Sequence, residues 1–241
     1  MTLQFIKIGS SCIFDENYSI RYGELKRMAS EIEKQKYHRG IDTVIISSGA
    51  IPYGKVLEGD YRKNSEIPTA RLRGYATTGQ AKLMALYDDL FSSQVGQILW
   101  TDKDLEEKDS VRDVIEDNIE REVVNIINWN DGTDPRQARK DNDVPAALGA
   151  VYCDADRLIM RGPYEGFYGS DGKLIEHISK VTDEHYSYCN GISCVGNGGF
   201  ATKLDAAKII LENEKEMIIG SIFYSLDDII SGAVPHTRFR R

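Results

Sequence analysis

Residues 5–11 read Phe-Ile-Lys-Ile-Gly-Ser-Ser, and residues 43–50 read Thr-Val-Ile-Ile-Ser-Ser-Gly-Ala. Each stretch begins as a short apolar run rich in β-branched residues, which is typical of a buried strand. Each then changes to glycine and serine, which allow a sharp turn and a close approach of backbone to ligand. The two stretches predict buried strands that end where open α/β sheets bind their ligands.

Further runs of the same kind occur at residues 97–100, 123–127, 157–160 and 217–220. Apolar residues at helical spacing lie between the runs, at 25–32 and 72–90, and further helices are expected at 111–121, 144–153 and 201–213. Strands that alternate with helices predict an α/β fold built on a mainly parallel sheet with helical crossovers.

Composition favours one globular domain over residues 1–241. Hydrophobic residues make up 41% and charged residues 28% of the chain, which excludes the low-apolar, high-charge signature of disorder. The net charge is −8 and the basic residues are scattered, so no footprint of a nucleic-acid binder is present. A small-molecule partner is the better expectation.

Nothing in the sequence indicates export or a membrane. The first eight residues lack the pattern of a signal peptide, and no apolar run approaches membrane-spanning length. Four cysteines without CxxC spacing predict neither a disulfide framework nor a metal site. A reducing, cytoplasmic setting is expected.

Two segments near the end of the chain are not assigned to regular elements. Residues 161–179 are dense in glycine and turn residues, which predicts a hairpin or loop. The basic residues 236–241 are interpreted as an ordinary solvated terminus. Neither segment indicates a domain boundary.

Lys7 is the unusual residue of the first strand. A lysine in a central strand must be paired or functional, because burial of a lone ammonium group is costly. The alternative, an edge lysine whose end reaches water, carries about equal weight from the residue alone. For Ser48 and Gly49 the simpler interpretation, turn geometry without function, is favoured when they are taken alone.

Polar residues gather after the strand at 123–127, as Asn128-Trp129-Asn130-Asp131, and again at Asp141-Asn142-Asp143. Asp143 precedes Val144-Pro145 and could simply cap a helix. It could also bridge two lysines and hold them for a phosphate.

The most specific motif runs Gly196-Asn197-Gly198-Gly199-Phe200-Ala201-Thr202-Lys203 and leads into a helix. Glycines expose backbone N–H groups, the helix N-terminus favours negative charge, and Lys203 adds a point charge, so an anion cradle is predicted. The motif does not fit GxxxxGK[ST], which argues against a P-loop. A plain glycine turn with a surface lysine is the weaker alternative.

In order, these strings resemble the amino acid kinase family, and within it the kinase domain of the glutamate 5-kinases. The strings are Lys7-Ile8-Gly9-Ser10-Ser11, Ile46-Ser47-Ser48-Gly49-Ala50-Ile51, Gly79-Gln80 with Leu83-Met84, Ile126-Ile127-Asn128-Trp129-Asn130-Asp131, Asp141-Asn142-Asp143 and Gly198-Gly199-Phe200-Ala201-Thr202-Lys203-Leu204. The resemblance covers nearly the whole chain.

The resemblance implies a three-layer αβα sandwich with an acceptor-binding half at about 1–150 and a nucleotide-binding half at about 151–241. It also implies ATP and Mg²⁺, phosphorylation of an amino acid carboxylate and a homo-oligomer, whereas the additional C-terminal domain that many glutamate 5-kinases carry is not expected here. Lys7 and Lys203 would flank the transferred phosphoryl group, and Asp143 would organise both lysines.

The same resemblance assigns the remaining site residues. Ser48, Gly49, Asn128, Asp131 and Asn142 would bind the acceptor, with a carboxylate for its ammonium group. Nucleotide contacts are implied for Lys7, Gly9, Ser10, Gly198, Gly199, Thr202 and Lys203.

Three places depart from the pattern of the glutamate 5-kinases. Trp129 stands where they usually have Glu, Pro52-Tyr53 replace small residues, and Arg161-Gly162 stand where Thr-Asp is usual. We expect Trp129 either to select a bulkier acceptor than glutamate or to turn into the core. Two other functions stay open: a non-catalytic nucleotide or amino acid sensor, and a nucleoside-phosphate kinase on the same fold.

Overall fold

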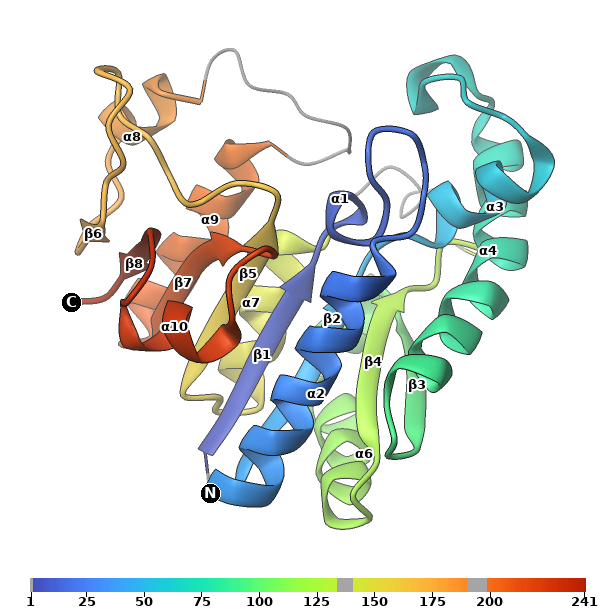
Figure 1. Ribbon diagram of the computed structural model, residues 1–241, viewed down its shortest axis with the longest axis horizontal. Helices are drawn as coiled ribbons and strands as arrows, with labels where there is room; N and C mark the ends of the chain where they lie inside the picture. The colour runs from blue at the N-terminus through green and yellow to red at the C-terminus, as the bar shows by residue number, and fades with distance from the viewer. Residues whose placement is uncertain (1, 134–140, 190–198) are drawn as a thin grey trace.

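The computed structural model describes residues 2–133, 141–189 and 199–241, and its centre is an eight-stranded sheet in the order β3-β4-β2-β1-β5-β7-β8-β6 (Figure 1). The strands are β1 Thr2–Ile8, β2 Ile41–Ser47, β3 Val95–Trp100, β4 Val124–Trp129, β5 Arg157–Gly162, β6 His177–Ile178, β7 Glu216–Ser221 and β8 His236–Phe239. From β3 to β7 all neighbours are parallel, whereas β8 is antiparallel to β7. The expected α/β fold with a mainly parallel sheet is confirmed.

Helices cover both faces of the sheet. They are α1 Ser10–Ile13, α2 Tyr22–Arg39, α3 Ala50–Glu58, α4 Thr69–Leu90, α5 Asp102–Glu106, α6 Lys108–Glu120, α7 Asp143–Tyr152, α8 Asp183–Ser187, α9 Phe200–Glu212 and α10 Leu226–Ser231. No helix in the described ranges combines the length and apolarity needed to cross a membrane.

Alternate residues of the central strands enter two separate cores. Phe5 packs with α7 and α9 on one face, and Ile6 packs with α2 and α4 on the other. A strand that is buried on both faces is apolar over most of its length, which explains the apolar runs in the sequence. The three layers expected for the sandwich are therefore present.

The strand register places the carboxyl ends of β1, β2 and β5 side by side. β1 lies between β2 and β5, and Lys7 is opposite Ile46 on one side and Met160 on the other. Because the strands are parallel, their carboxyl ends lie along one edge, at the top of the view in Figure 1 near α1. This is the edge at which open α/β sheets bind ligands.

Helices α3 and α4 cross unusually closely beside this edge. A Cβ atom on Gly54 would lie 2.1 Å from the backbone oxygen of Tyr75, and one on Gly79 would lie 1.9 Å from that of Ala50. Only glycine fits at either position, so the backbones of the two helices lie in direct contact.

The expectation for residues 236–241 is wrong, because residues 236–239 form β8 rather than a solvated terminus. The side chains of Thr237 and Phe239 are buried, and Thr237 Oγ1 accepts a hydrogen bond of 2.7 Å from the backbone N–H of Phe167. The turn-dense stretch before it does form a loop, closed by a bridge between Tyr168 and Leu174.

Candidate active site

Three charged side chains from three elements meet at the carboxyl edge of the sheet. Lys7 comes from the end of β1, Asp143 is the first residue of α7, and Lys203 lies in the first turns of α9. Lys7 Nζ lies 2.5 Å from Asp143 Oδ1, and Lys203 Nζ lies 3.0 Å from Asp143 Oδ2. One carboxylate therefore holds two ammonium groups, and the capping and bridging interpretations of Asp143 are resolved in favour of the bridge.

Burial makes the charges of this cluster depend on one another. Lys7, Asp143 and Lys203 are only 5%, 0% and 6% exposed, and water contributes little to their solvation. Burial opposes the charge on Asp143, but Lys7 and Lys203 outweigh it and hold the pKa of that carboxyl well below its usual range. Burial likewise opposes the charge on Lys7, yet Asp143 and Asp141 raise its pKa. Lys7 and Asp143 are therefore both ionised at neutral pH.

Asp141 and Thr202 fix this arrangement. Asp141 Oδ1 lies 3.4 Å from Lys7 Nζ and accepts a hydrogen bond of 2.8 Å from the backbone N–H of Asp143. Thr202 Oγ1 lies 2.8 Å from Asp143 Oδ2 and 2.9 Å from the backbone oxygen of Gly199, which precedes α9. Gly198 and the preceding part of the predicted anion cradle lie outside the described residues.

The small residues at the ends of β1 and β2 bring backbone close to Lys7. A Cβ atom on Gly9 would lie 3.8 Å from Lys7 Nζ, and Ser10 begins α1 directly afterwards. The backbone N–H of Ser48 donates 2.9 Å to the oxygen of Ile8. Gly49 has φ 110°, a left-handed value that favours glycine, and precedes α3.

A chain of amide groups extends from this cluster across the sheet edge. Asn142 Nδ2 lies 3.0 Å from both the backbone oxygen of Ser47 and Ser48 Oγ, and 3.2 Å from Asn128 Oδ1. Asn128 Nδ2 in turn donates 2.9 Å to Gln80 Oε1. Gln80 Nε2 is buried and has no hydrogen-bond acceptor among the residues that the structure describes.

A cavity of about 330 Å³ lies at the far end of this series of amide groups, lined by Gln80 and by residues 129–132 at the end of β4 and directly after it. Other walls come from the start of α3, from α4 and from β3. Asp131 is in this lining, and burial raises the pKa of its carboxyl to about 7. The volume suits a small polar metabolite.

The sequence profile of the amino acid kinase family matches residues 2–221. The chain belongs to the amino acid kinase family. It is 30% identical to a glutamate 5-kinase of Photorhabdus laumondii over 97% of this chain, and 28% identical to one of Idiomarina loihiensis over 98%. It covers 67% and 66% of those two proteins, respectively, and so spans about two thirds of their length.

Solved structures of similar fold are more distant from this chain in sequence than these two relatives are. The structure superposes on carbamate kinase from Giardia lamblia bound to AMP-PNP with a TM-score of 0.69 at 16% identity, covering 100% of this chain and 98% of the other. UMP kinase from Ureaplasma parvum gives a TM-score of 0.66 at 18% identity, with full coverage of both chains. At such identities the likeness establishes the fold alone.

Trp129, the first departure from the glutamate 5-kinase pattern, is 4% exposed and belongs to the core beneath α7. Its ring centroid lies 6.2 Å from that of Trp100, and its Nε1 donates 3.2 Å to the backbone oxygen of Asp141. The indole therefore packs mainly into the core, as the second alternative has it, and only its small exposed part contributes to the lining of the cavity.

Arg161 and Gly162 point to opposite faces of the sheet. Arg161 lies on the α2 side, where Nη2 donates 2.8 Å to the backbone oxygens of both Ser221 and Tyr224. Burial lowers its pKa to about 10. Arg161 thus ties the end of β5 to the turn after β7, whereas Gly162 faces the side that carries Lys7 and Lys203.

Sequence reasoning missed three members of the site. Asp141 and Gln80 stood inside the quoted strings but received no role, although an aspartate two residues before Asp143 was a usable signal for a loop that fixes a helix start. The third is Tyr164, whose ring lies 5.7 Å from Lys203 Nζ. Nothing local in the turn-dense segment indicated that contact.

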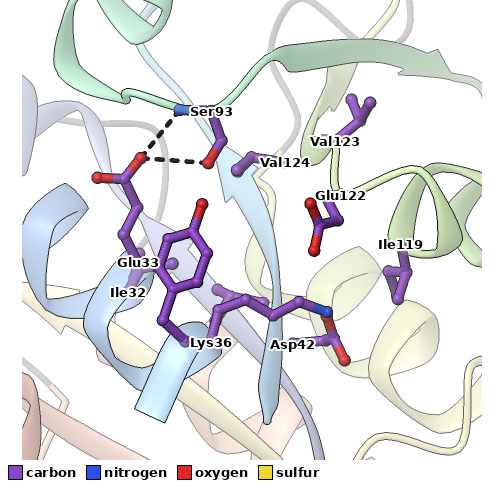
Figure 2. Close-up of a pocket in the computed structure, with 11 residues that line it drawn as sticks. Ile32, Glu33, Lys36, Asp42, Ser93, Ile119, Glu122, Val123 and Val124 are labelled. Atoms are coloured by element: carbon purple, nitrogen blue, oxygen red, sulfur yellow. Dashed lines mark hydrogen bonds and ion pairs between the residues drawn. The ribbon is translucent and has the colours of Figure 1, made fainter.

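A second hollow lies at the opposite, amino edge of the sheet and offers no comparable site (Figure 2). It encloses about 40 Å³, enough for water only. Two of its polar side chains are engaged with each other or with backbone: Lys36 pairs with Asp42, and Glu33 accepts from the backbone N–H of Ser93 at 3.0 Å.

Proposed function

We propose that this chain is an ATP-dependent kinase that phosphorylates the side-chain carboxylate of glutamate or a related amino acid. The observation that carries the proposal is the bridge from Lys7 through Asp143 to Lys203 at the carboxyl edge of the sheet. Family membership and the adjacent cavity support it. An alternative role for such a buried triad, pure structural support, would not call for two lysines at a ligand-binding edge.

Phosphoryl transfer needs mainly in-line positioning and positive charge around the equatorial oxygens. An oxygen of the acceptor carboxylate attacks the γ-phosphorus, the bond to the β,γ-bridging oxygen breaks, and ADP leaves with that electron pair. The acceptor needs no general base because it is already ionised near neutral pH. Lys7 and Lys203 would stabilise the phosphoryl oxygens from two sides.

The acceptor is proposed to occupy the cavity beside Gln80. Asp131 would take its ammonium group, while Asn128 and Asn142 would orient it and Ser48 and Gly49 would approach it from the end of β2. The cavity residues that the structure describes include no lysine or arginine, so an amino acid with a cationic end fits better than a phosphate.

ATP is proposed to enter as its Mg²⁺ complex on the side of α9. Gly9, Ser10, Gly199, Thr202 and Lys203 are the proposed contacts, and Gly198 keeps its predicted role although it lies outside the described residues. We further propose the division into an acceptor half at about 1–150 and a nucleotide half at about 151–241, a cytoplasmic location, and a homo-oligomer.

Incubation of the protein with Mg-ATP, hydroxylamine and a panel of amino acids tests the reaction. We expect ADP release together with a hydroxamate for one acceptor, because hydroxylamine traps acyl phosphates. ATP binding without ADP release above background across a broad carboxylate panel would instead establish the sensor. ADP release with nucleoside monophosphates alone would establish a nucleoside-phosphate kinase.

The sensor is the alternative that Arg161-Gly162, in place of the usual Thr-Asp of the nucleotide loop, would favour. Arg161 lies on the other face of the sheet and is engaged with backbone oxygens, so its presence does not block the lysine side. The substitution therefore weakens the case for catalysis less than the sequence indicated.

A further inference from the structure

Gly162 leaves a space at the end of β5 that Tyr164 fills. A Cβ atom at position 162 would lie 2.0 Å from Cζ, 2.2 Å from Cε1 and 2.5 Å from Oη of Tyr164. The phenol end of the ring therefore packs directly on the Gly162 backbone, and any side chain at 162 would displace it. Exposed Pro163 lies between the two residues and restricts the turn that folds the ring back.

The ring borders the charged cluster on the α9 side. Tyr164 lies 5.7 Å and Phe200 5.8 Å from Lys203 Nζ, measured to the ring centroids, and the two rings are 5.0 Å apart. An ammonium group within this range of aromatic faces is attracted by their quadrupoles. The two rings thus form a wall against Lys203 and limit where its ammonium group can move.

The hydroxyl of Tyr164 is an unused donor in this wall. It makes no hydrogen bond within the described ranges, although Tyr164 is only partly accessible. Burial raises its pKa well above the usual value, Lys7 acts in the opposite direction, and Asp143 raises it further, so the phenol keeps its proton. The nearby Asp143 already accepts from both lysines.

We propose that the Tyr164 hydroxyl donates a hydrogen bond to the terminal phosphate of bound ATP, making Tyr164 a residue that distinguishes ATP from ADP. The argument rests on the proposed function, which places that phosphate between Lys7 and Lys203. A neutral O–H donor beside two lysines suits an anionic oxygen, since hydrogen bonds to charged groups are the strong ones.

Calorimetric titration of Mg-ATP and Mg-ADP, with the acceptor omitted, tests the contact. We expect Tyr164→Phe to lower the affinity for Mg-ATP about tenfold or more and to change the affinity for Mg-ADP less than twofold, because only ATP carries the contacted phosphate. Tyr168→Phe is the matched control, since its hydroxyl serves Glu165 at 2.9 Å on the same loop, and both affinities should stay within twofold.

A second pair of variants keeps the test decisive if ring packing itself matters. Gly162→Ala should displace the ring and reduce ATP affinity selectively, whereas in a Tyr164→Ala background the same change should have no further effect. Equal losses for ATP and ADP in Tyr164→Phe, or no loss for either, would overturn the proposal. So would a parent that binds neither nucleotide.

The acceptor panel separates this inference from the proposed function. If the parent prefers ATP over ADP through Tyr164 but phosphorylates no acceptor, the Tyr164 contact is supported and the kinase function is contradicted. If hydroxamate forms but the ratio of ATP to ADP affinity is unaltered in Tyr164→Phe, the kinase function is supported and the Tyr164 contact is contradicted.

Discussion

Lys7 and Lys203 bind different oxygens of one carboxylate, that of Asp143, although they come from opposite ends of the chain. Their ammonium groups are therefore fixed relative to each other without a ligand. Positive groups that are held in place in advance stabilise developing charge effectively, because no reorganisation is needed during reaction. This relationship makes separate effects on turnover and on stability testable.

Replacement of either lysine should affect turnover more than folding. Lys7→Met and Lys203→Met should each lower kcat by about 10²–10³, the usual effect of losing a contact with transition-state charge. Stability should fall less, because Asp143 keeps one lysine in each variant. Lys208→Met, on the same helix, is the control in the ADP-release assay. A kcat within a few-fold of the parent would remove that lysine from the proposed mechanism.

Asp143→Asn, unlike the lysine variants, should cause a large loss of stability. Removal of the carboxylate charge leaves two buried lysines without their shared partner, which costs about 3–5 kcal/mol when a buried pair is broken. Urea unfolding measures this loss, with the exposed Asp113→Asn on α6 as the control. A difference below about 1 kcal/mol would show that the bridge does not stabilise the fold.

The difference in stability between the parent and Asp143→Asn should depend on pH. The folded pKa of Asp143 is below its unfolded value, so its contribution to stability is complete above about pH 4 and disappears as the pH falls through the folded value. The raised pKa of Lys7 keeps its own contribution complete below about pH 10. The stability gap between parent and Asp143→Asn should be constant from about pH 5 to 9 and shrink in acid. A gap that grows below pH 4 would contradict this assignment.

Much of the sheet was predictable because its strands are buried on both faces. The runs that became β1, β2 and β5 are mostly apolar, and that signal does not depend on tertiary detail. β8 was missed because charged residues dominate its segment. Its alternation was nevertheless present, with Thr237 and Phe239 inward and Arg238 less buried between them, as in a strand with one buried face.

The site was predictable only where residues lie in recognisable strings. Lys7 and Asp143 each also had a simple structural explanation, whereas that of Lys203 was the weaker one. The order of the three residues along the chain favoured the functional explanation through the family resemblance. The contact of Tyr164 with Lys203 joins a loop to a helix and depends on the absence of a side chain at Gly162. No spacing rule in the sequence expresses such a contact.

Phe239→Ala should destabilise the protein strongly, because β8 is part of the core. The side chain is fully buried, and truncation of a buried phenylalanine typically costs about 3–5 kcal/mol. Phe223→Ala, at a residue that is 45% exposed, should cost less than about 1 kcal/mol in the same denaturation experiment. Similar values for the two variants would contradict the placement of β8.

Asp131 should make acceptor affinity depend on pH near neutrality. Its pKa of about 7 means that the carboxylate needed for an ammonium group is only half formed at that pH. KM for the amino acid should therefore fall as pH rises from about 6 to 8, while KM for ATP changes little. Asp131→Asn should raise the acceptor KM and remove its dependence on pH between about 6 and 8. A pH profile that survives the substitution would assign the titration to another group.

The last prediction concerns Trp129, which packs in the core and donates from Nε1 to the backbone of Asp141. Trp129→Phe keeps an aromatic ring but loses that hydrogen bond, so Asp141 should be held less firmly against Lys7. We expect kcat to fall several-fold, with an unchanged ratio of kcat/KM between glutamate and the best other acceptor. Trp129→Glu should instead fail to fold stably, because it buries a carboxylate in apolar surroundings.

Trp100→Phe is the control for the loss of indole volume. Trp100 is equally buried beside Trp129, and its Nε1 has no hydrogen-bond partner among the described residues, so this substitution changes packing alone. It should lower stability as Trp129→Phe does and leave kcat near that of the parent. Equal kcat values in the two variants would reduce Trp129 to a packing residue. A tenfold change of acceptor preference in Trp129→Phe would restore a selecting role, because Trp129 contributes to the lining of the proposed acceptor cavity.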